Sequence, residues 1–169
     1  MPGARNVIIY TDPRYRGGQL VKESLLLDEW LSLRYPGVTS LGRMRLGPTA
    51  ATVRGVTLPP PYEAMLQVLN WYADAIVIAP AEQLVVEAKV IAKPDAIGQV
   101  LFYQRLISRT AELTAYLQVV FQPVVLFAEE DLEVSAFARS LGVRVEIYTP
   151  PWIASYVATV QYKPRTGVV

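Results

Sequence analysis

The feature that most constrains the fold is a pair of apolar, β-branched runs followed at once by a helical pattern. Residues 72–79 (YADAIVIA) and 84–91 (LVVEAKVI) are strand-length runs that enclose the turn signal at 80–83, and this arrangement predicts a β-hairpin. A helical pattern opens at Asp95, the expected N-cap, and continues to Ile107. Its apolar residues lie on nearly every side, so we expect a buried helix packed on the sheet that contains the hairpin.

Helix and strand patterns on both sides of the hairpin predict a layered fold. Apolar residues recur at helical spacing through 22–35, and residues 38–46 alternate like a strand. The proline-rich stretch 47–61 is expected to be irregular, and a short helix is expected at 62–70. The elements expected after the hairpin and its helix are a strand at 119–128, a helix at 129–141 and a strand at 143–149. This order predicts an α/β fold with a mixed central β-sheet flanked by helices.

The chain shows no repeat and no linker that would divide it. Its 169 residues are enough for one domain with a large core. We therefore expect a single domain over 1–169, with an irregular N-terminal arm at 1–21 and a basic C-terminal tail at 150–169.

Two residue types are missing, and their absence narrows the possible chemistry. The chain has no His and no Cys. This excludes Ser-His-Asp triads, imidazole bases, thiol catalysis, disulfides and metal sites that depend on His or Cys. Any acid–base or metal chemistry must therefore use carboxylates, Lys, Tyr or water.

The apolar content is high, yet the apolar runs are short. Hydrophobic residues make up 52% of the chain, but no run approaches the roughly 20 residues that span a bilayer. We therefore expect an intracellular, cytoplasmic protein without a membrane partner. The 13 prolines, the scarcity of Asn and the absence of Cys favour a thermophilic source.

Charged residues are rare in the two strand runs of the hairpin, so the three that occur there are candidates for function. Glu87 and Lys89 are two residues apart in the second run and therefore point to the same face. If residues 81 and 82 form the turn, position 74 faces position 89, and Asp74 lies beside both side chains; a one-residue slip would turn it to the other face. Taken alone, this D…ExK pattern is explained at least as well by an ordinary cross-strand charge pair on a solvated face.

Two polar residues on the following helix favour a functional site over an ordinary charge pair. Gln99 and Tyr103 are one turn apart and share a helix face, and Gln99 follows Lys89 by ten residues. Polar side chains on an otherwise apolar, sheet-packed helix need partners. A sheet face that carries carboxylates is one candidate partner.

The polar residues of the hairpin and the helix follow one another in the order of a known motif. They are Asp74, then Glu87-Ala88-Lys89, then Gln99-x-x-x-Tyr103. This series resembles the PD-(D/E)XK nuclease superfamily, in particular its RecB-type branch with a QxxxY motif. Ala73 stands where many members have a proline, and the upstream His of that branch is absent. The resemblance implies a restriction-endonuclease-like core with the order α-β-β-β-α-β-α-β over residues 22–149.

The resemblance also implies a metal-dependent deoxyribonuclease. Phosphodiester hydrolysis needs an activated water and neutralised phosphate charge, which one or two Mg²⁺ (or Mn²⁺) ions on carboxylates supply. Asp74 and Glu87 would be metal ligands together with the main-chain carbonyl of Ala88. Lys89 would orient or activate the water.

Other residues would complete this site. Gln99 and Tyr103 would hold the scissile phosphate or Lys89 in place. Glu23, on the apolar stripe of the first helix, is a candidate for a further acidic ligand, although a position at the edge of the core explains it equally well. Arg43 and Arg45 share one face of the 38–46 strand and are candidates for contacts with nucleic-acid phosphates, unless that face is simply a solvated edge.

Two functions of different classes remain open from the sequence. The first is a nuclease that cuts DNA through Asp74, Glu87 and Lys89. The second is a nuclease fold without turnover that serves as a binding or assembly module. The small size, weak net charge of +1 and high apolar content lead us to expect a homodimer or a larger complex in either case. A phage or mobile-element setting would suit both.

Overall fold

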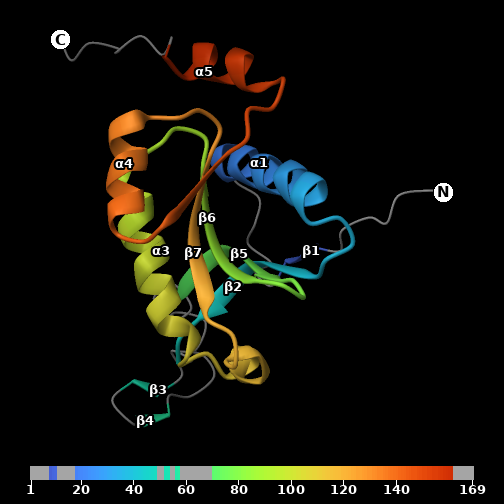
Figure 1. The fold of residues 1–169 in the computed structure, drawn as a ribbon, viewed down its shortest axis with the longest axis vertical. Helices are drawn as coiled ribbons and strands as arrows, with labels where there is room; N and C mark the ends of the chain where they lie inside the picture. The colour runs from blue at the N-terminus through green and yellow to red at the C-terminus, as the bar shows by residue number, and fades with distance from the viewer. Residues whose placement is uncertain (1–7, 11–17, 49–51, 54–55, 58–69, 162–169) are drawn as a thin grey trace.

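The computed structural model describes residues 8–10, 18–48, 52–53, 56–57 and 70–161 (Figure 1). Strands of a central sheet are β1 (Ile8–Tyr10), β2 (Ser40–Leu46), β5 (Trp71–Ile78), β6 (Gln83–Lys89), β7 (Phe121–Phe127) and β8 (Arg144–Ile147). Among the described residues they form one six-stranded sheet in the order β1-β2-β5-β6-β7-β8. The pairs β2–β5 and β5–β6 are antiparallel, and the other three pairs are parallel. The predicted mixed sheet is confirmed.

Helices lie on both faces of this sheet and enclose two hydrophobic cores. The helices α3 (Pro94–Ile107) and α4 (Leu132–Ser140) lie on one face, and α1 (Gly18–Arg34) lies on the other (Figure 1). The helix α5 (Ile153–Gln161) follows β8 and lies near α1. The predicted α/β class is therefore confirmed.

Alternate residues of β6 point into the two cores. Val85 belongs to the core under α3, whereas Leu84, Val86 and Ala88 belong to the core under α1. Because side chains alternate along a strand, the odd-numbered positions of β6 face α3. This parity decides where the charged residues of the strand lie.

The hairpin forms as predicted, but its register differs from the expected one by two residues. Ala75 pairs with Val86 and Ile78 pairs with Gln83, so position 74 comes opposite position 87 and not 89. The turn is centred on residues 80 and 81, because proline suits the first central position of a turn and has no N–H for a ladder. A shift of two residues keeps every side chain on its face.

The helix α3 differs from the prediction at its start and in its burial. Lys93 is the N-cap and Pro94 is the first helical residue, so the prediction of Asp95 as N-cap is wrong; proline is favoured at this position because no helical partner is lost. The prediction of burial on nearly every side is also wrong. Phe102 is 41% exposed and packs edge-to-face on Trp71, with ring centroids 5.0 Å apart.

The remaining elements lie close to their predicted positions. The helix α4 begins three residues later than expected, because the side chain of Asp131 caps it by accepting a hydrogen bond from the Val134 N–H. The expected irregular arm contains β1 and the start of α1, and the expected tail contains α5. Three short elements are η2 (Ala111–Tyr116) and the two-stranded ribbon of β3 (Thr52–Val53) and β4 (Val56–Thr57). Apart from Asn70, the helix expected at 62–70 lies outside the described residues.

Candidate functional site

The candidate site lies where the two strands of the hairpin stop pairing. The last pair of β5 and β6 is Ala75 with Val86. Beyond it β5 remains paired with β2, and β6 remains paired with β7. Asp74 and Glu87 are the first residues past this last pair, one on each strand. The sequence-predicted carboxylates therefore stand opposite each other at the point of separation.

Asp74 is held by the main chain of the neighbouring strand. Its Oδ2 accepts a hydrogen bond of 2.9 Å from the Ala88 N–H, which has no main-chain partner on β5 at this point. In a strand the N–H and C=O of one residue point to the same side. The carbonyl of Ala88 therefore also points toward β5 and Asp74, as a metal ligand would require.

Lys89 joins the acidic residues of the sheet to one residue of α1. Its Nζ lies 2.6 Å from Oε1 of Glu87 and 3.9 Å from Oε2 of Glu23. Lys89 is the last residue of β6, so its side chain can reach past the end of the sheet to a helix on the opposite face. The structure thus brings the sequence-predicted Glu23 to the same cluster.

Burial and mutual repulsion disturb the acid–base equilibria of this cluster. Glu87 is 3% exposed, and burial, together with the nearby Asp74 carboxylate, raises its pKa to about 8. Burial is also the main cause that raises the pKa of Asp74 and of Glu23. Burial would lower the pKa of Lys89, but the three carboxylates, led by Glu87, outweigh it and raise that pKa. Near neutral pH the Asp74–Glu87 pair therefore retains a proton, which we assign to Glu87.

Tyr103 and Gln99 come to the cluster from α3. Tyr103 is 6% exposed, and its pKa is raised by burial and then by the charges of Glu87 and Asp74, which places its hydroxyl within electrostatic reach of both. Gln99 lies one turn earlier on the same helix face. Its Oε1 is buried and has no hydrogen-bond partner among the described residues. A buried amide oxygen without a partner is costly unless a further group satisfies it.

The two arginines of β2 have different surroundings. Arg43 lies 3.8 Å from the Asp74 carboxylate, measured from Nη1 to Oδ1. Arg45 lies away from the cluster: its guanidinium donates to Glu112 of η2 and to the Gly47 carbonyl, both at 2.6 Å. The contact between Arg43 and Asp74 was not predicted, because it depends on the pairing of β2 with β5.

The oxygen atoms of the cluster are of the kind that binds a divalent cation, although they are not already arranged around a cation position. Within the described part of the chain, no three acidic side chains converge so as to hold a metal ion. Two carboxylates and one main-chain carbonyl are nevertheless enough for Mg²⁺, which keeps several of its waters. Once Glu87 releases its proton, the three carboxylates of Asp74, Glu87 and Glu23 outnumber the cations of Lys89 and Arg43, and a bound metal cation would compensate the added negative charge.

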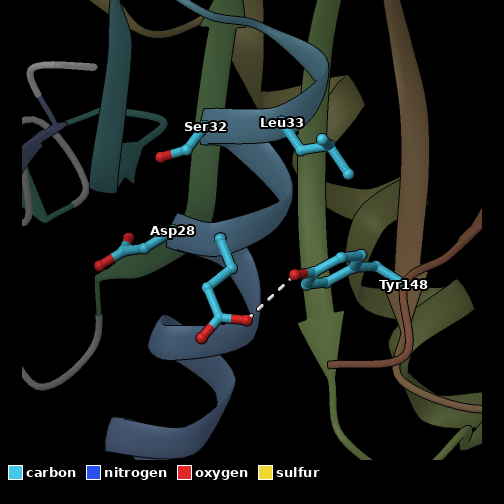
Figure 2. A pocket seen from close by; sticks show the side chains of 5 residues that line it. Asp28, Ser32, Leu33 and Tyr148 are labelled. Atoms are coloured by element: carbon cyan, nitrogen blue, oxygen red, sulfur yellow. Dashed lines mark hydrogen bonds between the residues drawn. The ribbon is translucent and has the colours of Figure 1, made fainter. Parts of the chain in front are cut away.

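A shallow hollow of about 470 Å³ lies elsewhere, on the outer side of α1. Figure 2 shows Asp28, Ser32 and Leu33 of this helix at its rim, with Tyr148 donating a hydrogen bond to Glu29 across it. The members of the carboxylate cluster are not among its lining residues. The hollow is therefore distinct from the candidate site.

Comparison with models of known families, with curated proteins and with solved structures finds no match. Within the described ranges, no helix has the length and apolar character needed to cross a membrane.

Proposed function

We propose that the chain is a metal-dependent nuclease of the PD-(D/E)XK type that hydrolyses phosphodiester bonds in DNA. One observation carries the proposal: the buried carboxylate of Glu87 and the partly buried carboxylate of Asp74 stand opposite each other where β5 and β6 stop pairing, beside Lys89. Paired buried carboxylates with strongly perturbed pKa values are more typical of functional sites than of structural ion pairs.

The order of elements supports the same proposal. From α1 through β8 the chief elements run α1-β2-β5-β6-α3-β7-α4-β8. This is the α-β-β-β-α-β-α-β order of the restriction-endonuclease-like core that the resemblance implies. The acidic pair lies on the second and third strands of that series, and the QxxxY pair lies on the helix that follows.

Asp74, Glu87 and the Ala88 carbonyl would hold a Mg²⁺ or Mn²⁺ ion. A cation bound at these groups supplies a more acidic water and neutralises charge on the phosphate. Each carboxylate is oriented by one hydrogen bond: the Ala88 N–H donates to Asp74, and the Lys89 ammonium donates to Glu87. Glu23 lies 3.9 Å from the same ammonium.

The remaining residues of the cluster would position the reactants. Lys89 would orient the attacking water and offset phosphate charge. The Tyr103 hydroxyl and the Gln99 amide N–H would donate hydrogen bonds to the scissile phosphate. The unpaired Gln99 Oε1 needs a donor, and the Lys89 ammonium would supply one. Arg43 lies close enough to the acidic pair to contact the same phosphate, whereas Arg45 would serve only more distant nucleotides.

A cleavage assay tests this proposal. Supercoiled plasmid and end-labelled single-stranded and duplex oligonucleotides are incubated with Mg²⁺ or Mn²⁺ and with the wild type, Glu87→Gln or Lys89→Met. Glu130→Gln, a change of an exposed carboxylate near α4, is the matched control. Loss of cutting in the first two variants and full cutting in the control is the expected result. Equal cutting by all four proteins would refute the assignment of these residues.

A binding or assembly module without turnover is the second candidate function. The observation that favours it is that each carboxylate already has a cation of its own, Lys89 at 2.6 Å from Glu87 and Arg43 at 3.8 Å from Asp74. This candidate predicts no cutting, no Mn²⁺ binding, and a homodimer or complex detectable by light scattering. Mn²⁺ binding that depends on Glu87 would exclude it.

A further inference from the structure

Arg43 is placed opposite Asp74 by the pairing of β2 with β5. Gly42 pairs with Ala75 and Met44 pairs with Ala73, so the residue between them faces position 74. The guanidinium lies 3.8 Å from the Asp74 carboxylate and over the ring of Tyr72, 5.5 Å from its centroid. Both contacts hold the Arg43 guanidinium beside Asp74, whereas the Lys89 ammonium lies beside Glu87.

The backbone of Arg43 is strained in this position. Its φ is +50°, and among the described residues it is the one non-glycine residue with a positive φ. L-residues other than Gly, Asn and Asp rarely adopt this conformation, and it persists only where surrounding contacts enforce it. The strain and the ion pair are two independent signs that the fold holds this side chain in place.

A cation on Asp74 must compete with this guanidinium. A guanidinium displaced from a carboxylate is well suited to a phosphate, which offers the same bidentate geometry. Asp74 and a bound phosphate would therefore be alternative partners of one side chain.

We propose that Arg43 is an internal counter-ion of Asp74 that a divalent cation displaces, and that the released guanidinium then binds the substrate phosphate. This inference rests on the proposed nuclease function and deepens it, because it makes Arg43 a positioning residue that couples cation binding to substrate binding. In the free protein the same residue weakens cation binding.

Calorimetric titration with Mn²⁺ tests the first half of the proposal. The wild type is compared with Arg43→Gly and Arg43→Ala, and with Arg45→Gln as the matched control, because Arg45 lies on the same strand but pairs with Glu112. Both Arg43 variants should bind Mn²⁺ about fivefold to tenfold more tightly than the wild type. The Arg45 variant should bind like the wild type.

The pair of Arg43 variants separates charge from strain. Glycine adopts a positive φ without cost, whereas alanine does not. The Tm of Arg43→Gly should therefore exceed that of Arg43→Ala, while the two share one Mn²⁺ affinity. At saturating Mn²⁺ both should cut DNA at least tenfold more slowly than the wild type, because the phosphate contact is lost.

The outcomes distinguish this inference from the function on which it rests. Equal or weaker Mn²⁺ binding by the Arg43 variants, with normal binding by the wild type, would overturn the inference and leave the proposed function standing. Unchanged cutting at saturation would overturn the phosphate contact. Failure of the wild type and of every variant to bind Mn²⁺ would overturn the proposed function and the inference together.

Discussion

Asp74 and Ala88 are joined by a hydrogen bond of 2.9 Å in which the side chain of one strand accepts from the main chain of its neighbour. The bond forms where the ladder between β5 and β6 has ended. The Asp74 carboxylate thus takes the place of the missing strand partner, and the main chain fixes its orientation. At the end of a strand ladder the side chains are held rigidly, and main-chain groups such as the Ala88 carbonyl have no strand partner and can bind a ligand.

Replacing Asp74 should separate its structural role from its proposed ligand role. Asn keeps an oxygen for the Ala88 N–H, whereas Ala leaves that N–H unsatisfied and should lower the free energy of unfolding by about 1–3 kcal/mol relative to Asn. Neither Asp74→Asn nor Asp74→Ala should bind Mn²⁺. Urea unfolding and Mn²⁺ titration of the two variants check this, and wild-type Mn²⁺ affinity in Asp74→Asn would show that the carboxylate is only structural.

The metal-free protein should lose stability as the pH rises from about 5 to 8. The folded-state pKa of Glu87 is about 8, raised above the ordinary value of 4.5 by burial and by Asp74. The folded state therefore binds a proton that the unfolded state has released, and this stabilisation is present below pH 4.5 and lost as the pH rises through 8. We expect the loss to be on the order of 3 kcal/mol.

Glu87→Gln is the control for this pH dependence, because its amide does not titrate. Its stability should vary less with pH than that of the wild type, and at pH 8 it should be the more stable protein. Some dependence should remain, since the pKa values of Asp74 and Glu23 are shifted in the same direction. Thermal unfolding from pH 5 to 8 measures how the stability of each protein depends on pH. The same dependence in both proteins would refute the raised pKa of Glu87.

Much of the hairpin was predictable from the sequence, because its information is local. The alternation of residues 72–91 specifies which side chains share a face, so Asp74, Glu87 and Lys89 were expected together. The register was off by two residues because the turn depends on the exact position of Pro80. An error of two residues changes the opposite neighbour but not the face.

Features that depend on long-range pairing were not predictable. Arg43 meets Asp74 only because β2 pairs with β5 in one particular register, and no local pattern specifies that register. The positive φ of Arg43 likewise has no signal in its residue type. Glu23 could be proposed from its helix position, but its approach to Lys89 depends on how α1 crosses the sheet.

Gln99→Ala and Tyr103→Phe should lower turnover and leave Mn²⁺ binding nearly unchanged. The two residues are proposed to position the phosphate or Lys89 and not to ligate the cation, so turnover should fall by about 10²-fold or more. Gln104→Ala is the matched control on the same helix. Its amide donates to the Phe121 carbonyl at 2.8 Å, so this change should cost stability without a comparable loss of turnover. Single-turnover cleavage and Mn²⁺ titration of the three variants check the distinction, and equal effects in all three would show that the QxxxY match is accidental.

Stability at the other end of the sheet should be independent of the candidate site. The Tyr35 hydroxyl donates to Glu82 at 2.7 Å and accepts from Arg144 at 2.8 Å, and Arg144 also donates to Glu82. Tyr35→Phe removes the shared hydroxyl and should lower the free energy of unfolding by about 1–2 kcal/mol. Urea unfolding measures that loss. Cleavage and Mn²⁺ affinity at 25 °C should be unchanged, and a large change in either would link the two ends of the sheet.

The most direct test of the proposed cation site is a calorimetric titration of the metal-free wild type with Mn²⁺ at pH 7, repeated in two buffers of different ionisation enthalpy. With a pKa of about 8, Glu87 must give up its proton when a cation binds. We predict binding that releases close to one proton with the first cation, and no such binding by Glu87→Gln. Absence of binding by the wild type, or binding that Glu87→Gln leaves unchanged, would contradict the assignment of the Asp74–Glu87 pair as a metal site.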